Sequence, residues 1–309
     1  MLEKGYEVTV YDLYLYGEIF SHLQHHPQLT QIKGDIRDQK KIIEASRNTD
    51  AIIHLACISN DPSYELNPDL GKSINYDAFF HILDAGLENN VQRFIYASSS
   101  SVYGIKKEKN VTENASCEPL TDYSKYKLEC EKILLNCKDT TMERVILRPA
   151  TVCGYAPRLR LDLVVNILTI HALINKKIKI FGGAQLRPNI NINDIVNVYE
   201  TLLTAPSQSI NGQIFNAGYQ NYSIEELATI IQETIGDPTI ELEQIPSDDI
   251  RSYHINSEKI QSILGFQPQY TIEDAVRSLE RAYGEGLIID GLTNPLYHNI
   301  KLMKNVNIV

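Results

Sequence analysis

Short apolar segments alternate with longer segments of helical periodicity through the first half of the chain. We expect strands at residues 50–55, 93–97 and 144–147, and helices at residues 74–89 and 123–136. Apolar strands that alternate with helices indicate a parallel sheet covered by helices on both faces. The sequence therefore predicts an α/β protein with a doubly wound parallel sheet.

The second half keeps this alternation less strictly. Helices are predicted at residues 162–174, 193–204 and 223–235, and a short strand at residues 178–181. The stretch GQIFNAG, residues 212–218, has the pattern of a strand that could rejoin the first sheet. We therefore expect two parts whose segments are interleaved along the chain.

Charge and cysteine content exclude several classes of protein. The formal net charge of −10 argues against a surface for nucleic acid or anionic membranes, and no apolar segment reaches the ~20 residues of a membrane span. The five cysteines have no metal-ligand spacing and are expected to be free thiols in a reducing compartment. The histidines of HLQHH, residues 22–26, are assigned to a surface loop. We expect a cytoplasmic protein without a metal site.

The stretch YSKYK is the strongest sign of chemistry. Tyr123 and Lys127 are four residues apart on a predicted helix, so their side chains share one face. A nearby ammonium group lowers the pKa of a phenol and makes it a better base. Upstream, the serines of ASSSSVYG follow the strand at 93–97, where an open parallel sheet places its site. Tyr-x-x-x-Lys alone is usually structural, but this combination favours proton transfer at a substrate oxygen.

The beginning of the chain resembles the second strand of a dinucleotide-binding unit. EVTVYD alternates apolar and polar residues and ends at Asp12. An acidic residue at the end of that strand is the usual partner of a cofactor ribose.

With these stretches in order, the sequence resembles extended short-chain dehydrogenases/reductases that act on nucleotide sugars, the group that contains the UDP-galactose 4-epimerases. The other matching motifs are GDIRD, IIHLAC, SINYDAFFHILDAG, RPATVCG and IFGGAQLRPNININD. The resemblance implies a Rossmann-type fold. Residues 1–150 would bind NAD, residues 189–220 would return to that domain, and residues 151–309 would form a smaller substrate-binding domain.

The resemblance also implies roles for single residues. Ser99, Tyr123 and Lys127 match the catalytic set, with the neighbouring serines as alternatives for Ser99. The positions matching the NAD site are Asp12 at the ribose, Asp35 and Ile36 at the adenine, Leu55, Ala56 and Asn75 along the cofactor, and Pro149, Ala150, Tyr123 and Lys127 near the nicotinamide. Ser99, Thr151, Arg187 and Arg251 match substrate-binding positions, the two arginines at the diphosphate of a nucleotide sugar.

The glycine loop of the family is the largest departure. It precedes the ribose-binding acid by about 20 residues, and counting back from Asp12 leads beyond Met1. We therefore expect the first strand, the glycine loop and most of the first helix to be missing from this chain. A truncated chain or a misplaced start explains this better than a working enzyme without that unit.

Two smaller departures bear on the reaction. Thr151 and Cys153 stand where the family often has Asn and Tyr. Ser100 and Ser101 stand where the 4,6-dehydratases carry an Asp and a Glu for eliminating water. Since a hydroxyl cannot do that acid–base work at neutral pH, the sequence argues against a dehydratase.

The favoured function is an NAD-dependent nucleotide-sugar 4-epimerase that passes through a 4-keto intermediate. Two alternatives stay open. The same catalytic set would serve a reductase of nucleotide 4-keto-sugars that consumes NADH or NADPH, and a chain with an incomplete cofactor site could be a non-catalytic relic. The resemblance further implies a homodimer formed through the helices at residues 75–89 and 123–136.

Overall fold

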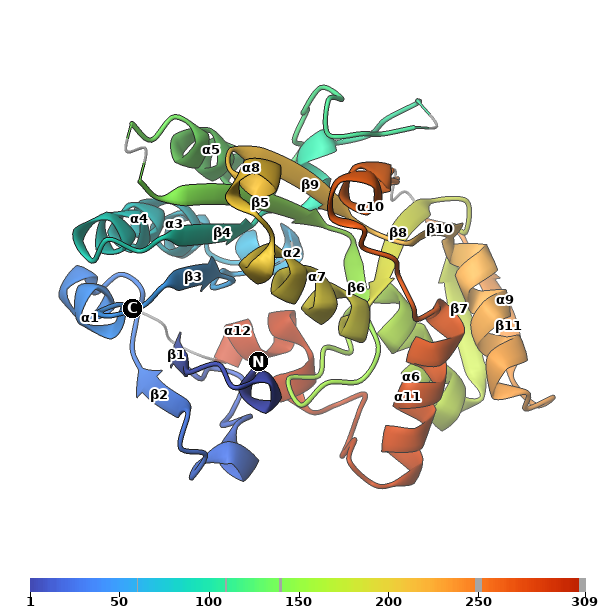
Figure 1. The fold of residues 1–309 in the computed structure, drawn as a ribbon. Helices are drawn as coiled ribbons and strands as arrows, with labels where there is room; N and C mark the ends of the chain where they lie inside the picture. The colour runs from blue at the N-terminus through green and yellow to red at the C-terminus, as the bar shows by residue number, and fades with distance from the viewer. Residues whose placement is uncertain (60, 109, 139–140, 248–251, 306–309) are drawn as a thin grey trace.

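The computed structural model describes residues 1–59, 61–108, 110–138, 141–247 and 252–305. Its largest sheet is parallel and has the order β3–β4–β5–β9 (Figure 1). The strands are β3 (Ala51–His54), β4 (Arg93–Ala97), β5 (Glu143–Pro149) and β9 (Gln213–Ala217). The last of these lies in GQIFNAG and pairs with β5, with Ala217 beside Pro149.

Two further parallel strands form a sheet of their own. β1 (Val8–Asp12) pairs with β2 (Leu29–Lys33), and Asp12 lies beside Lys33. Among the described residues, no strand pairs with the second edge of β1 or of β3. The sequence predicted β1, whereas β2, whose side chains are exposed or half-buried, was not predicted.

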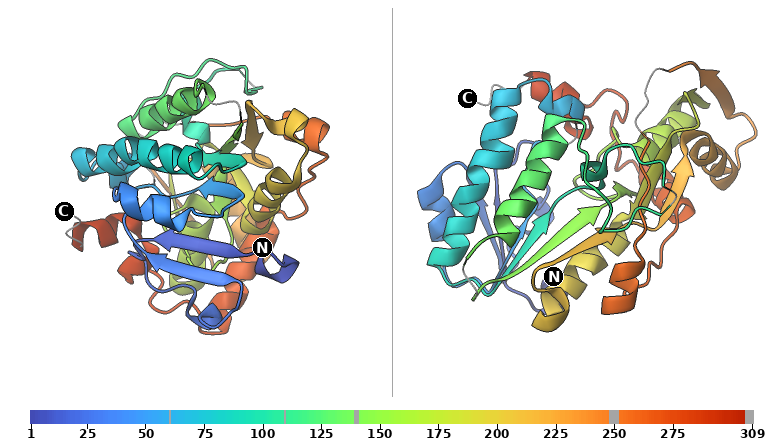
Figure 2. Two further views of the ribbon diagram at one scale, coloured as in Figure 1. Left: turned by 60° about the vertical axis from the view of Figure 1, so that its left-hand side comes forward. Right: turned by 90° about the horizontal axis from the view of Figure 1, so that it is seen from above.

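Helices cover both faces of the four-stranded sheet (Figure 2). Phe94 and Tyr96 of β4 pack against the helices on one face of the sheet. Ile95, between them, packs against the helices on the other face. This alternation follows from the two-residue period of a strand. The first face is covered by α1 (Gln39–Ala45), α3 (Pro68–Lys72), α4 (Ala78–Glu88) and α5 (Asp122–Leu135), and the second by α7 (Ile192–Thr204), α8 (Ser207–Ile210) and α10 (Glu258–Leu264).

The predicted helix at residues 74–89 has an irregular start. Ser73–Asp77 forms a π-helical turn, and the regular helix α4 begins only at Ala78. By contrast, α5 begins at a regular capping box, because Thr121 Oγ1 accepts from the Ser124 amide and Ser124 Oγ accepts from the Thr121 amide. This cap fixes Tyr123 in the first turn of α5.

The remaining elements form a second part around a core of its own. It contains the sheet β10–β8–β6, the pair β11–β7 and three longer helices. Their bounds are β6 (Thr151–Cys153), β7 (Lys177–Phe181), β8 (Leu186–Asn191), β10 (Gln220–Ser223), β11 (Glu241–Ile245), α6 (Val164–Asn175), α9 (Ile224–Ile235) and α11 (Ile272–Gly284). β8 pairs with β6 and β10, and its Ile190 packs in the core of the first part together with α7.

Short helices complete the fold. They are α2 (Asp61–Tyr64), α12 (Asn299–Asn305) and turns at Leu2–Lys4, Ser21–Leu23, Ser100–Tyr103 and Pro295–Tyr297. Helix α12 lies in a region for which the sequence carried no interpretable signal, and it packs against α2. Within the described ranges, every helix is too short or too polar to cross a membrane.

Candidate active site

The carboxyl end of β4 and the first two turns of α5 meet at Lys127. This side chain is buried, with 3% exposed, and its Nζ donates a hydrogen bond of 2.7 Å to the Ala97 carbonyl. The same Nζ lies 5.0 Å from the ring centroid of Tyr96 and 6.0 Å from that of Tyr123. Lys127 therefore holds a fixed positive charge at the end of the strand and below the Tyr123 ring.

The serines that follow β4 make two different sets of contacts. Ser98 is buried and donates to Glu131, away from Tyr123. Ser99 caps the turn Ser100–Tyr103: its Oγ accepts from the Ser101 amide at 3.2 Å and lies 2.9 Å from the Ser101 Oγ. The Ser99 hydroxyl also lies near the Tyr123 phenol and lowers its pKa. Ser99 is therefore the serine that acts on Tyr123.

The Tyr123 phenol is held in its neutral form by its surroundings. Burial raises its pKa far above the usual range, and the nearby Cys57 and Asp61 raise it further. Arg160 and the nearby Ser99 lower the pKa but do not outweigh burial. The charge of Arg160 therefore also acts on Tyr123, and the sequence had not singled out this arginine.

His54, at the end of β3, lies beside Lys127 in the core. Its ring centroid is 5.6 Å from that of Tyr96 and 5.8 Å from that of Phe79. Burial, and then the charge of Lys127, lower the pKa of His54 to about 3. The imidazole is therefore neutral in the folded protein at any pH near neutrality.

This pKa predicts a loss of stability in acid. Unfolded His54 titrates near ~6.5, so between about pH 6.5 and pH 3 the unfolded chain binds a proton that the folded chain does not. Stability rises with pH wherever the unfolded state binds more protons, and at pH 4.5 His54 should cost ~2–3 kcal/mol relative to neutral pH. Urea titrations between pH 4.5 and 7.5 measure this slope. His54→Phe should flatten it and His22→Gln, on an exposed loop, should not; equal slopes in all three proteins would contradict the assignment.

The residues predicted at the adenosine lie at the ends of β1 and β2. Asp12 is exposed and accepts from the Tyr14 amide at 2.6 Å. Asp35 forms an ion pair with Arg37, with 2.7 Å between Oδ2 and Nη2, and Ile36 is buried. The Tyr11 hydroxyl donates to the Asp35 carbonyl at 2.9 Å, which joins the two strand ends. Asp12 and Asp35 therefore lie at the carboxyl ends of two neighbouring strands.

The next predicted positions surround the loop after β3. Leu55, which directly follows β3, is 55% exposed, and Ala56 beside it is half-buried. Asn75 is buried in the π-helical turn and makes hydrogen bonds to both the amide and the carbonyl of Ile58, at 2.8 and 2.9 Å. Asn75 therefore shapes this loop, and the exposed apolar surface of Leu55 fits a cofactor that would cover it.

The predicted nicotinamide and substrate segments follow β5. Ala150 is buried and its amide donates to the Ala217 carbonyl at 2.7 Å, so Pro149–Ala150 is held against β9. Thr151 begins β6 and is half-buried. Arg187, on β8, is half-buried, with its guanidinium 5.8 Å from the Tyr253 ring. Arg251 lies outside the described residues.

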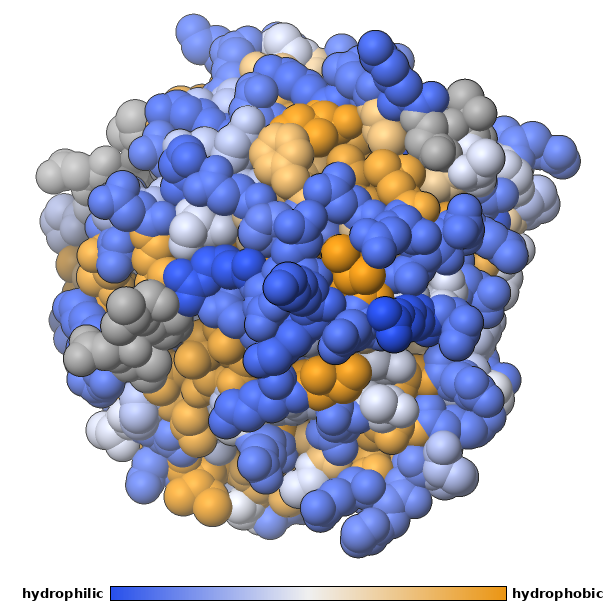
Figure 3. All heavy atoms as spheres, turned by 90° about the vertical axis from the view of Figure 1, so that its left-hand side faces the viewer, coloured by the Kyte–Doolittle hydropathy of each residue, from blue (hydrophilic) through white to orange (hydrophobic). Residues whose placement is uncertain are grey.

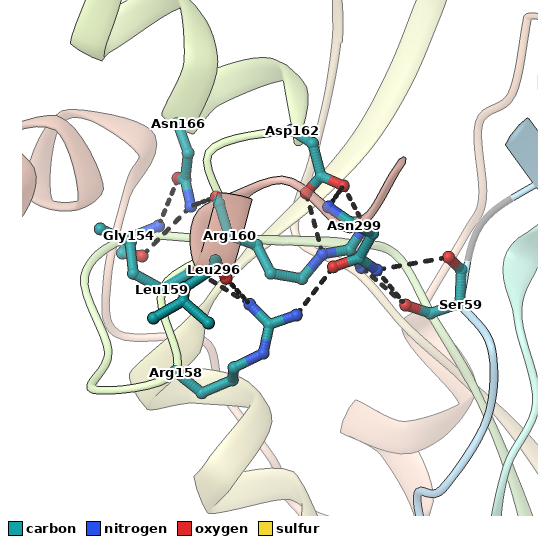
Figure 4. Close-up of polar contacts among 9 residues, drawn as sticks. All are labelled: Ser59, Gly154, Arg158, Leu159, Arg160, Asp162, Asn166, Leu296 and Asn299. Atoms are coloured by element: carbon teal, nitrogen blue, oxygen red, sulfur yellow. Dashed lines mark hydrogen bonds and ion pairs between the residues drawn. The ribbon is translucent and has the colours of Figure 1, made fainter. Parts of the chain in front are cut away.

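An arginine cluster beside the site was not predicted (Figure 4). Arg160 binds Asp162 at 3.0 Å and Ser59 at 3.2 Å, and Arg158 binds the Asn299 side chain at 2.7 Å. The Asn299 amide group also reaches the Ser59 hydroxyl at 2.9 Å. The cluster thus joins the loop after β3, the segment after β6 and α12. The two arginines of RLRLD were its only sign in the sequence.

A pocket of about 230 Å³ opens beside Tyr123. It is lined by Asp61, Tyr64, Glu65, Pro68, Leu120, Thr121, Asp122 and Tyr123. Thr121 donates to Asp61 at 2.6 Å across it. The lining carries hydroxyl and carboxylate oxygens that can bind the hydroxyl groups of a sugar.

The chain belongs to the NAD dependent epimerase/dehydratase family, whose model matches residues 1–218. A UDP-glucose 4-epimerase of Halalkalibacterium halodurans is 25% identical over 290 residues, which cover 87% of this chain and 86% of that protein. An uncharacterized UDP-glucose epimerase of Bacillus subtilis is 31% identical over 241 residues, or 76% of this chain and 74% of that protein. The predicted family and its cofactor, NAD, are confirmed.

Solved structures of the same kind share the fold. The UDP-glucose 4-epimerase of Thermotoga maritima, solved with UDP-glucose, has a TM-score of 0.81 and 20% identity, with 93% of both chains covered. A dTDP-glucose 4,6-dehydratase of Streptomyces venezuelae with NAD bound has a TM-score of 0.81 and 22% identity, covering 94% of this chain and 90% of that one. This likeness confirms the Rossmann-type α/β class.

Proposed function

We propose that the protein is an NAD-dependent nucleotide-sugar epimerase that acts at C4 of the sugar. The observation that carries this proposal is the meeting of Ser99, Tyr123 and Lys127 at the carboxyl end of β4. A hydroxyl, a phenol and a fixed ammonium group together can remove a proton from a secondary alcohol and return it. The family consists of NAD-dependent epimerases and dehydratases, which supports the same chemistry.

The residues divide the work as follows. Tyr123 takes the proton of the 4-hydroxyl group and later returns it, and Ser99 donates a hydrogen bond to the same sugar oxygen. Lys127 is fixed by Ala97, so its charge is in place to favour the phenolate once substrate and cofactor are bound. The 4-keto sugar then turns over in the pocket beside Tyr123, so that the second transfer reaches the opposite face.

The residues that would hold NAD are those at the ends of β1, β2, β3 and β5. Asp12 and Asp35 would bind the adenosine, Leu55 and Ala56 would cover the middle, and Pro149–Ala150 would lie against the nicotinamide. When bound there, NAD would accept the hydride from C4 of the sugar and would later return that hydride. Arg187 and Arg251 are proposed for the nucleotide diphosphate, since guanidinium groups match phosphate oxygens, and Thr151 is proposed for a further substrate contact.

A dehydratase fits the site less well. Ser100 and Ser101 follow Ser99, and the Ser101 hydroxyl bonds Ser99. Glu131, the buried carboxylate of α5, is engaged by Arg148 with 2.6 Å between Oε2 and Nη2. Elimination of water would need an acid and a base where Ser100 and Ser101 stand, so the epimerase is preferred.

Incubation with NAD and either UDP-glucose or UDP-galactose tests the proposal. We expect the C4 epimer to appear in the proton NMR spectrum without net consumption of NAD, because the hydride returns to the sugar. A parallel incubation with a nucleotide 4-keto-sugar and NADH tests the reductase alternative. Reductase activity would appear as a fall in the absorbance of the reduced nicotinamide. Steady NADH consumption without epimer formation would overturn the epimerase in favour of the reductase.

The chain is further proposed to act in the cytoplasm as a homodimer that packs through α4 and α5. On α4, Phe80 is 40% exposed, and it would pack against the second copy. Figure 3 shows the face that lies on the left in Figure 1, where apolar areas are separated by hydrophilic side chains. Sedimentation of wild type and Phe80→Glu tests this interface, and a wild-type monomer would contradict it.

A further inference from the structure

A buried ion pair lies directly behind the catalytic residues. Glu131 of α5 is 1% exposed and Arg148 of β5 is 3% exposed. Arg148 Nε donates to Glu131 Oε1 at 2.9 Å, and Arg148 Nη2 donates to Oε2 at 2.6 Å. Two parallel bonds of this kind fix both side chains in one relative orientation.

The Glu131–Arg148 pair contacts or adjoins three segments of the proposed site. Glu131 is one helical turn beyond Lys127 and two turns beyond Tyr123, so the three side chains share a face of α5. Ser98, the residue before Ser99, donates its hydroxyl to Glu131. Arg148 is the residue before Pro149, in the segment proposed for the nicotinamide. One ion pair therefore connects the helix, the serine segment and the end of β5.

The same network continues to β9. Arg148 Nη1 donates to the Tyr103 hydroxyl at 2.9 Å, and this hydroxyl donates to Asn216 Oδ1 at 2.7 Å. Asn216 is followed by Ala217, which accepts the amide of Ala150. Burial alone would lower the pKa of Arg148, but the bonds with Glu131 outweigh it and raise the pKa above the usual range. The guanidinium of Arg148 thus stays charged inside the core.

We propose that Glu131 and Arg148 are positioning residues that set the spacing between Ser99, the Tyr123–Lys127 face and the Pro149–Ala150 backbone. The proposal rests on the proposed function of that site. A buried ion pair is a poor device for stability alone, because apolar residues of similar volume often do as well. We infer that this ion pair is present because it connects three segments of the site.

A double variant separates positioning from stability. Changing one partner leaves an unpaired buried charge and destabilises the fold, whereas Glu131→Leu with Arg148→Met removes both charges. The matched control is Arg93→Met with Glu143→Gln, because Arg93 and Glu143 pair at the amino ends of the same strands β4 and β5, with 2.6 Å between Nη2 and Oε2. Ser98→Ala removes only the hydroxyl that reaches Glu131, and it serves if the double variant does not fold.

Two measurements decide the outcome. In the Glu131–Arg148 double variant we expect amide exchange in residues 98–104 and 149–153 to be at least about tenfold faster, and kcat to fall about 10²-fold with KM for the nucleotide sugar nearly unchanged. Ser98→Ala should show both changes at smaller size, and the control neither. Unchanged exchange in residues 98–104 overturns the proposal, as does wild-type kcat in a variant with faster exchange. A wild type that turns over no nucleotide sugar contradicts the proposed function instead, and the exchange data still decide on positioning.

Discussion

Tyr123→Phe should reduce kcat for C4 epimerisation by ~10³-fold, within the range found for loss of a general acid–base group. The phenol oxygen is the atom that exchanges the proton of the sugar, and the nearby Ser99 hydroxyl cannot replace it as a base. The ring itself stays, so NAD affinity should be unchanged. Because burial raises the pKa of Tyr123, the wild-type rate should increase with pH as the phenolate becomes populated.

The control for this variant is Tyr126→Phe on the same helix. The Tyr126 ring lies 5.1 Å from Tyr76 and 6.1 Å from Tyr64, measured between centroids, on the side facing those rings. Steady-state rates and NAD titrations of both variants make the comparison. Tyr123→Phe with more than a tenth of the wild-type kcat would exclude Tyr123 as the proton-transfer group.

Lys127→Met should lower kcat by ~10²-fold or more and weaken NAD binding. The ammonium group that favours the phenolate is lost, and the Ala97 carbonyl loses its 2.7 Å hydrogen bond inside the core. A buried carbonyl without a partner costs ~1–3 kcal/mol, so the midpoint of thermal unfolding should fall as well. Since the charge of Lys127 also lowers the pKa of His54, that pKa should rise in the variant, which NMR of the imidazole protons can follow.

Lys125→Met separates the specific role of Lys127 from the loss of any positive charge on α5. Lys125 is exposed and pairs with Asp122 at 3.0 Å. An exposed pair of this kind contributes little to stability, so this variant should keep both the wild-type rate and the unfolding midpoint. A rate loss of equal size in the two lysine variants would mean that general electrostatics, not the position of Lys127, favours the reaction.

Strong periodicity made much of the fold predictable from the sequence. RFIYA predicts a strand at residues 93–97, and β4 has those bounds. Four of its five side chains are buried, so its apolar sequence was a clear sign of a core strand. The helix predicted at residues 123–136 corresponds to α5, which begins one residue earlier at its capping box. Weakly apolar elements escaped notice: β10 consists of QNYS, and its pairing with β8 depends on a partner more than thirty residues away.

The electrostatics of the site could not be predicted for a similar reason. Tyr-x-x-x-Lys places Lys127 on the face of Tyr123 but cannot show that Ala97 engages its ammonium group. Arg160 reaches the site through Ser59, about a hundred residues away in sequence, so only the folded chain shows that its charge acts on Tyr123. The roles of Asp12, Asn75, Arg187 and the other predicted positions remain predictions for the ligand-bound protein.

The late return of β9 has a consequence for how the protein is made. β9 completes the sheet beside β5, but the ribosome reaches residues 213–217 only after it has produced β6, β7 and β8. Until then, the growing chain has an exposed edge at β5, and Arg148 lacks the link through Tyr103 to Asn216. The sheet of the first part can therefore be completed only after several strands of the second part have been made.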